Sequence, residues 1–250
     1  MQFHVLIMRE YRSFSFKNAN FRISTDKFDL LTTAIIKLRT ELENYIMIHP
    51  AFQTAMQPIS LLENAPPIAV HMAQAATAAG VGPMAAVAGA IAQLSAEIAI
   101  SHGAKETIVE NGGDIFVYAQ NPVMVGIYSG SGILKDKLAL QIMPHDTPIA
   151  ICASSGKMGR SFSYGKCELA IVTSHNACLA DTAATATANY VKKTEDIKLA
   201  LSKAISIKGV LGVIIIHEGM VGIAGNIPSL VKNPQGLQTN LITGFSLNSK

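Results

Sequence analysis

An apolar, alanine-rich stretch at residues 80–100 constrains the fold most, because it must lie either in a membrane or inside a protein core. Gln93, Ser95 and Glu97 interrupt it, and alanine is its commonest residue, whereas a membrane-spanning helix carries mainly Leu and Phe. The small alanine side chain instead lets neighbouring backbones come close. The stretch therefore predicts a buried, closely packed helix and no membrane partner.

Apolar residues spaced three and four apart predict a long amphipathic helix that begins after an N-cap at Asp26 and stops at His49-Pro50. Proline and glycine punctuation predicts two more helices in the alanine-rich region, and periodicity predicts two in the last third of the chain. These four helices are expected at 67–79, from Pro83 to about Ser101, at Ala177–Lys192 and at Asp196–Ser206.

Short β-branched and aromatic runs between turn residues predict strands, with hairpin turns near Lys17-Asn18-Ala19 and at Glu218-Gly219. The strands are expected at Phe3–Met8, Ser13–Lys17, Asn20–Ser24, Thr107–Val109, Ile115–Ala119, Met124–Tyr128, Leu138–Ile142, Ile149–Ala153, Ala170–Thr173, Val213–His217 and Met220–Ala224. With no internal repeat or linker, one domain over 1–250 is expected, with a weakly ordered polar tail at 232–250.

The composition is that of a globular protein: 49% of residues are apolar and 15% are charged. The net charge of +3 is spread along the chain without a basic run, which argues against a nucleic-acid partner. The three cysteines, Cys152, Cys167 and Cys178, lack CxxC spacing, and they suit a reducing cytoplasm better than disulfides or a zinc site.

The segment Asn111-Gly112-Gly113-Asp114 joins two predicted strands. Two glycines can adopt positive φ and let a ligand approach the main chain, while Asp114 could accept hydrogen bonds from it. Asn-Gly-Gly is also an ordinary hairpin sequence. Both interpretations stay open at this point.

The segment Ser154-Ser155-Gly156 follows another predicted strand, and Lys157 and Arg160 come directly after it. Hydroxyls, glycines and cations together suit a phosphate group. The spacing is not that of a Walker loop, and a solvated basic loop is an equal alternative.

Asp181, Thr185 and Asn189 share one face of the helix predicted from Ala177. A carboxylate and a hydroxyl one turn apart can give two oxygen ligands to Mg²⁺, which keeps waters and takes substrate phosphate for its remaining positions. Polar residues on a helix face are also commonly just solvated. Alanines on the neighbouring faces would allow close backbone contact.

Four segments resemble the motifs of the ApbE family and occur in the same order: Gly82–Ala90, Asn111–Ile115, Cys152–Gly156 and Ala180–Ala186. Over almost its whole length the chain looks most like the UPF0280 group of ApbE-like proteins. The resemblance implies a T-fold-like α/β (α+β) architecture, with a mixed, mostly antiparallel sheet packed against long helices. ApbE proteins are Mg²⁺-dependent transferases that move FMN from FAD to a threonine hydroxyl of a target protein.

The resemblance implies Asp181 and Thr185 as metal ligands, from the family's Asp-x-x-x-Thr motif. It also implies a cofactor site for FAD or another nucleotide, formed by Gly89, Asn111, Gly112, Gly113, Asp114, Ser154, Ser155 and Gly156. Two departures weaken the case for flavin transfer. Ala88 stands where the family has a ligand-contacting Lys, and the segment 160–165 lacks the family's His and Asp.

Three functions therefore remain open, each with a small-molecule partner and the possibility of a homo-oligomer. The chain could be a cation-assisted transferase or hydrolase, a protein that binds a nucleotide without chemistry, or an accessory protein in sulfide incorporation into homocysteine. For the third, Cys152 would need a lowered thiol pKa. The chain keeps the family's metal-ligand motif but lacks its ligand-contacting Lys and the His and Asp of the segment 160–165. This combination favours a protein that binds a ligand and a cation but does not carry out ordinary FMN transfer.

Overall fold

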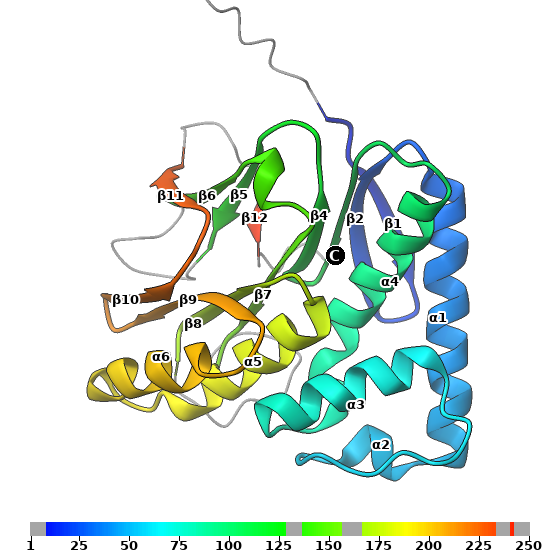
Figure 1. The fold of residues 1–250 in the computed structure, drawn as a ribbon, viewed down its shortest axis with the longest axis horizontal. Coiled ribbons are helices and arrows are strands. Elements are labelled where there is room, and N and C mark those ends of the chain that lie inside the picture. The colour runs from blue at the N-terminus through cyan, green and yellow to red at the C-terminus, as the bar shows by residue number, and fades with distance from the viewer. Residues whose placement is uncertain (1–8, 129–136, 157–166, 234–240, 243–250) are drawn as a thin grey trace, which may run out of the picture.

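The computed structural model describes residues 9–128, 137–156, 167–233 and 241–242 (Figure 1). The predicted strand Phe3–Met8 lies outside the described residues. The helices are α1 Phe28–Ile48, α2 Ala51–Thr54, α3 Pro67–Ala79, α4 Val87–Ser101, α5 Ala177–Tyr190 and α6 Ile197–Ile205, with short 3₁₀ turns η1 Pro83–Ala86, η2 Pro144–Asp146 and η3 Thr194–Asp196.

An eight-stranded antiparallel sheet forms the centre of the molecule, with the order β1-β2-β3-β4-β7-β8-β9-β10. Its strands are β1 Arg12–Phe16, β2 Ala19–Thr25, β3 Thr107–Asn111, β4 Asp114–Tyr118, β7 Ile149–Ser154, β8 Leu169–Ser174, β9 Val210–His217 and β10 Met220–Gly225. This confirms the predicted mostly antiparallel sheet packed against long helices.

A second, four-stranded sheet has the order β11-β6-β5-β12, with β12 parallel to β5. Its strands are β5 Val123–Ile127, β6 Leu138–Ile142, β11 Ser229–Lys232 and β12 Leu241–Ile242. The sequence did not indicate β11 or β12. The tail predicted to be weakly ordered thus begins at the last residue of β11 and contains a short strand.

Alternation along the strands of the large sheet creates two apolar cores. Phe116 points into the core beneath the helices, whereas its neighbours Ile115 and Val117 point into the core shared with the small sheet. The protein therefore has three layers: helices, a large sheet and a small sheet. Both faces of the central strands are buried, which explains their nearly continuous apolar sequence.

The alanine-rich helix is buried as predicted: α4 contacts α1, α3, α5 and β3. The stretch Pro83–Ser101 is long and apolar enough to cross a membrane, but this is weak evidence, since core helices share those properties. Its inward face consists mostly of small residues, including Ala90, Ala92 and Ala96. The structure divides the predicted helix into η1 and α4 at Ala86.

One local prediction was wrong, and one short helix was not predicted. Lys27, not Asp26, occupies the N-cap position of α1, and no side chain caps that helix end. The short helix α2 was also missed, because four residues are too few to show a helical period.

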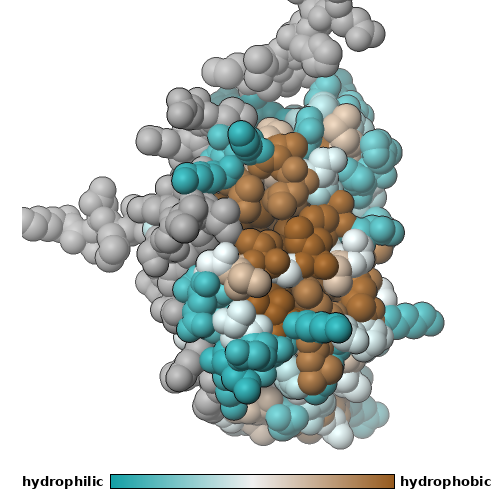
Figure 2. Space-filling model, turned by 90° about the vertical axis from the view of Figure 1, so that its left-hand side faces the viewer, coloured by the Kyte–Doolittle hydropathy of each residue, from teal (hydrophilic) through white to brown (hydrophobic). Residues whose placement is uncertain are grey.

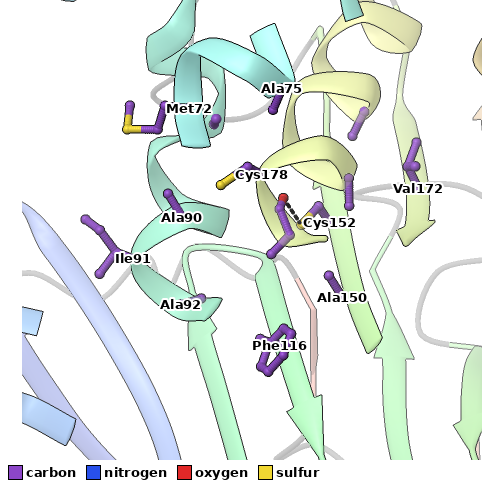
Figure 3. Packing of buried hydrophobic residues seen from close by; sticks show 14 of the residues in the cluster. Met72, Ala75, Ala90, Ile91, Ala92, Phe116, Ala150, Cys152, Val172 and Cys178 are labelled. Carbon is purple, nitrogen blue, oxygen red and sulfur yellow. Dashed lines mark hydrogen bonds between the residues drawn. The ribbon is translucent and has the colours of Figure 1, made fainter. Parts of the chain in front are cut away.

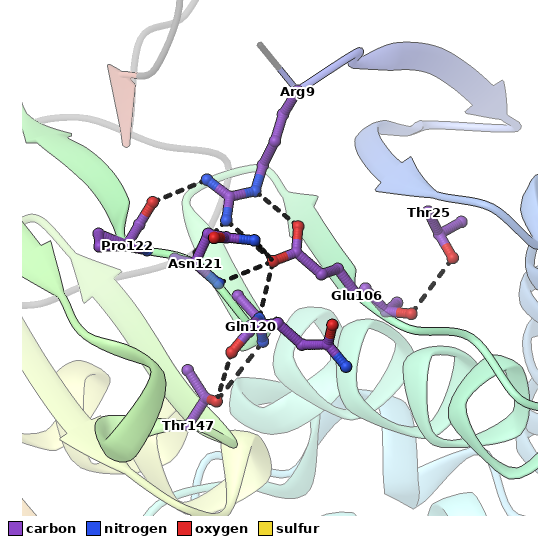
Figure 4. A network of polar contacts seen from close by, with 9 residues as sticks. Arg9, Thr25, Glu106, Gln120, Asn121, Pro122 and Thr147 are labelled. Carbon is purple, nitrogen blue, oxygen red and sulfur yellow. Dashed lines mark hydrogen bonds and ion pairs between the residues drawn. The ribbon is translucent and has the colours of Figure 1, made fainter. Parts of the chain in front are cut away.

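Arg9 ties the first described residues to the connection between β4 and β5 (Figure 4). Its guanidinium donates to both oxygens of Glu106 and to the carbonyls of Asn121 and Pro122. Glu106 also accepts the backbone N–H groups of Gln120 and Asn121. These charge-assisted contacts keep the pKa of Glu106 low even though its partial burial opposes this.

Strand β10 forms an uncharged edge of the large sheet, with Met220, Val221 and Ile223 exposed. Figure 2 views the molecule from the side on which β10 lies in Figure 1 and shows apolar atoms gathered across that face. The opposite edge strand, β1, carries Arg12. Charge on an edge strand discourages pairing with other chains, and β10 lacks it.

Candidate functional site

Asp181 on α5 accepts a hydrogen bond from the backbone N–H of Gly89 on α4, with 2.9 Å between Oδ2 and N. Gly89 is the third residue of α4, so the carboxylate lies where the first N–H groups of a helix have no partner within it. Asp181 is buried. It is therefore not a solvated helix residue, and it joins α5 to the start of α4.

Gly89 is required by the closeness of these two helices. A Cβ added there would lie 2.4 Å from the carbonyl oxygen of Ala177 and 3.1 Å from the Cβ of Asp181. No side chain fits at that separation. This confirms that the small residues of the region permit close backbone contact, and it explains how the N–H of residue 89 reaches Asp181.

The Asn111–Asp114 segment forms a two-residue hairpin turn, with Gly112 at φ +64° and Gly113 at φ +112°. Asn111 Nδ2 donates to the carbonyl of Ala88 at 3.2 Å. Asp114 Oδ1 accepts the N–H of Ala153 at 3.3 Å. The turn is thus ordinary hairpin chemistry, and it also brings two polar side chains to the start of α4 and the end of β7.

Asp114, Cys152 and Asp181 form what we call the acidic corner, where β4, β7 and α5 meet. Burial raises the pKa of Asp114 to about 7, although the Cys152 thiol and the Ala153 N–H stabilise its charged form. Burial, and then the charge of Asp114, raise the pKa of Asp181 well above its usual value. Two buried carboxylates near each other resist simultaneous ionisation.

The Cys152 thiol is buried against α5, and its Sγ donates to the carbonyl oxygen of Ala177 at 3.6 Å (Figure 3). Burial raises its pKa, and the charges of Asp114 and Asp181 raise it further. Cys152 therefore lacks the lowered pKa that an active thiol would need. Cys152 packs as a small core residue.

The Ser-Gly loop begins at the end of β7, where Ser154 is buried. Ser155 Oγ and the Gly156 N–H both donate to the carbonyl of Cys167, at 3.4 and 2.9 Å. Lys157 and Arg160, predicted to attract a phosphate, lie outside the described residues. Since β4 and β7 are neighbours, this loop is close to Asp114.

A cleft of about 820 Å³ opens among the helices, a volume typical of small-molecule sites. Its walls come from the end of α3, from η1 and Val87, from the second half of α5, from α6 and from the segment 53–57. We call it the helical cleft. Thr185 and Asn189 line it, whereas among the described residues neither the 111–114 turn nor residues 154–156 do.

The described residues thus divide the predicted site into the acidic corner and the helical cleft, which meet on α5. Asp181 lies in the corner, and Thr185, one turn later, lines the cleft. Oxygen donors of this kind suit Mg²⁺, which keeps several waters. No group of three or more His, Cys, Asp or Glu side chains is placed to hold a metal within the part of the chain that the structure describes.

Sequence reasoning missed Tyr190 and Lys203, which line the helical cleft from α5 and α6. The Lys203 ammonium lies 4.1 Å from the centroid of the Tyr190 ring. No short motif joins two residues on consecutive helices. Their pairing depends on how α6 packs against α5, which local periodicity does not specify.

The raised pKa values of two carboxyl groups in the large sheet predict how the stability of the protein depends on pH. Burial raises the pKa of both Asp114 and Glu110 to about 7, so between about pH 4 and pH 7 the folded state holds protons that the unfolded chain has released. The free energy of unfolding of the metal-free protein should therefore fall as pH rises through this range. Urea denaturation at several pH values measures it.

Asp114→Asn should flatten this pH dependence. Asp196→Asn is the control, because the backbone N–H of Lys192 holds the pKa of that exposed carboxyl low and it stays ionised throughout the range. A wild-type stability that does not change between pH 5 and pH 7 would contradict this prediction.

Structural comparison identifies the class of fold. A mutant of the flavin transferase ApbE from Vibrio cholerae superposes with a TM-score of 0.55 at 10% identity, covering 87% of this chain and 97% of that one. The ApbE protein from Thermotoga maritima gives a TM-score of 0.54 at 14% identity, covering 87% and 97%. The chain therefore has an ApbE-type fold.

Sequence comparison then identifies the family. The family model described as AbpE bacteria matches residues 16–220. A UPF0280 protein from Methanothrix thermoacetophila is 39% identical over 208 residues, which cover 83% of this chain and 87% of the relative. A UPF0280 protein from Archaeoglobus fulgidus is 39% identical over 232 residues, covering 89% and 94%. The chain belongs to the ApbE-like UPF0280 family.

Proposed function

We propose that the chain binds a phosphate-bearing small molecule, a flavin or another nucleotide, together with a divalent cation held by Asp181 and Thr185. One observation carries the proposal: the polar face of α5 runs from the acidic corner, at Asp181, into the helical cleft, at Thr185 and Asn189. A cation at this boundary would contact protein oxygens on one side and a ligand in the cleft on the other.

The chemistry of both parts supports this. The cleft walls consist mostly of Ala, Val, Met and Ile side chains with a few polar groups, which suits a ligand with a flat apolar ring. Two protein oxygens leave most octahedral positions of Mg²⁺ open for water and phosphate. The bound cation would neutralise phosphate charge. The solved relatives are described as flavin transferases, which supports a flavin among the candidate ligands.

Calorimetric titration tests the proposal. FMN, FAD and ATP are each titrated into the protein with EDTA and then with Mg²⁺. We expect at least one of them to bind, and to bind more tightly with Mg²⁺. If none binds under either condition, the proposed function is wrong.

We further predict that ordinary FMN transfer is absent. Ala88 has only a methyl group where the ApbE family has a ligand-contacting Lys, and its carbonyl is already bonded to Asn111. Incubation with FAD, Mg²⁺ and a flavin-acceptor domain should leave the acceptor unmodified by mass spectrometry. An active ApbE transferase serves as the positive control, and efficient flavinylation by this chain would contradict the prediction.

A further inference from the structure

Lys203 stands out among the residues of the helical cleft. It comes from α6, and its ammonium lies over the ring of Tyr190 on α5, 4.1 Å from the centroid. A cation above an aromatic face is held there by the ring quadrupole. The pair thus presents a positive charge to the cleft where α5 and α6 form its wall.

The charge on the described walls of this cleft is positive. Among the described residues that line it, Lys203 is the only one with a formal charge, and no Asp or Glu is present. Asp181 is not among the described residues that line the cleft, and its carboxylate bonds to Gly89. An anionic group in the cleft would therefore meet attraction at Lys203, and the described part of the wall places no carboxylate against it.

The proposed cation site at Thr185 and the Lys203–Tyr190 pair reach the cleft from different turns of α5. Thr185 and Tyr190 are five residues apart, which corresponds to about 7.5 Å along a helix axis. Apolar side chains, including Val87 and Ala186, line the cleft with them. A ligand that satisfies both features needs a phosphate at the cation, an apolar ring, and a second anionic group at Lys203.

We propose that Lys203, positioned by Tyr190, binds a second anionic group on the ligand, so that the preferred substrate class is an aromatic nucleotide with an additional carboxylate or phosphate. This rests on the proposed function, because the first phosphate is the one shared with the cation. It adds what the cation cannot provide: discrimination between ligands that differ only at the end far from Asp181.

Matched ligand pairs test the proposal by calorimetry, all with Mg²⁺. Nicotinate mononucleotide is compared with nicotinamide mononucleotide, which replaces the carboxylate with a neutral amide. Adenosine bisphosphate is compared with adenosine monophosphate, which lacks the second phosphate. The wild-type protein should prefer the more acidic member of at least one pair by about tenfold, the effect of one charge-assisted hydrogen bond. The pair that shows the preference identifies the anionic group.

Variants then assign the preference to Lys203. Lys203→Met should abolish it, Lys203→Arg should retain it, and Lys198→Met, an exposed lysine of the same helix outside the cleft wall, should leave it unchanged. Retention of the preference in Lys203→Met, or equal binding of both members by the wild type, overturns the proposal while leaving nucleotide binding intact. If none of these four ligands binds although FMN, FAD or ATP does, this proposal fails and the proposed function stands; if none of the seven binds, the proposed function itself fails.

Discussion

Gly89→Ala should destabilise the protein by about 3 kcal/mol, the upper part of the range for overpacking a core. At an open helical position the same change would stabilise by roughly 0.5–1 kcal/mol, because Ala is the better helix former. Here the new methyl group would lie 2.4 Å from the Ala177 carbonyl oxygen, and backbone cannot rotate away as a side chain can. Separation of α4 from α5 would also lengthen the bond between residue 89 and Asp181.

Thermal denaturation measures this effect, and we expect a decrease in Tm of about 6–12 °C for a chain of this size. Gly219→Ala is the matched control. Gly219 has φ +77° and nothing within 4 Å of an added Cβ, so only the strain of about 1 kcal/mol from positive φ should appear. A Gly89→Ala protein as stable as wild type would show that the two helices can move apart freely.

Asp181→Asn should remove the cooperativity between Mg²⁺ and the nucleotide. If both bind at Asp181 and Thr185, each tightens the other by the same factor, and together they raise Tm by more than the sum of their separate shifts. The free energy of coupling between two ligands is typically roughly 1–3 kcal/mol. Each kcal/mol of added stability raises the Tm of a chain of this size by about 2–4 °C. Asparagine keeps an oxygen that can accept the Gly89 N–H but loses the charge.

Thermal shift assays with Mg²⁺ alone, with the nucleotide alone and with both measure how far the combined increase in Tm exceeds the sum of the separate increases. The assays are made on the wild type and on the variant, and this difference is called the excess below. The metal-free Asp181→Asn protein should melt close to wild type, because the substitution also removes a carboxylate that burial disfavours. Asp29→Asn, at an exposed carboxylate of α1, is the control and should keep the excess. An unchanged excess in Asp181→Asn would exclude Asp181 as the cation ligand.

Most elements of the fold could be predicted because their signals are local. The apolar period of three and four residues in α1 and the alternation of Phe14, Phe16, Phe21 and Ile23 in β1 and β2 are each complete within one element. Strands β11 and β12 were missed because they are short, and their pairing with β6 and β5 depends on distant segments.

For the candidate site, too, some features could be predicted from the sequence and others could not. The order of motifs and the spacing of Asp181, Thr185 and Asn189 could be read from the sequence, because positions four apart on a helix share a face whatever surrounds it. Only the tertiary structure shows Asp181 bonded to Gly89, Cys152 buried with a raised pKa, and Lys203 over Tyr190. These contacts join residues that are 13 and 92 positions apart in the sequence. Such contacts, and the burial and desolvation that shift pKa values, arise only when helices and sheets pack, so no local pattern specifies them.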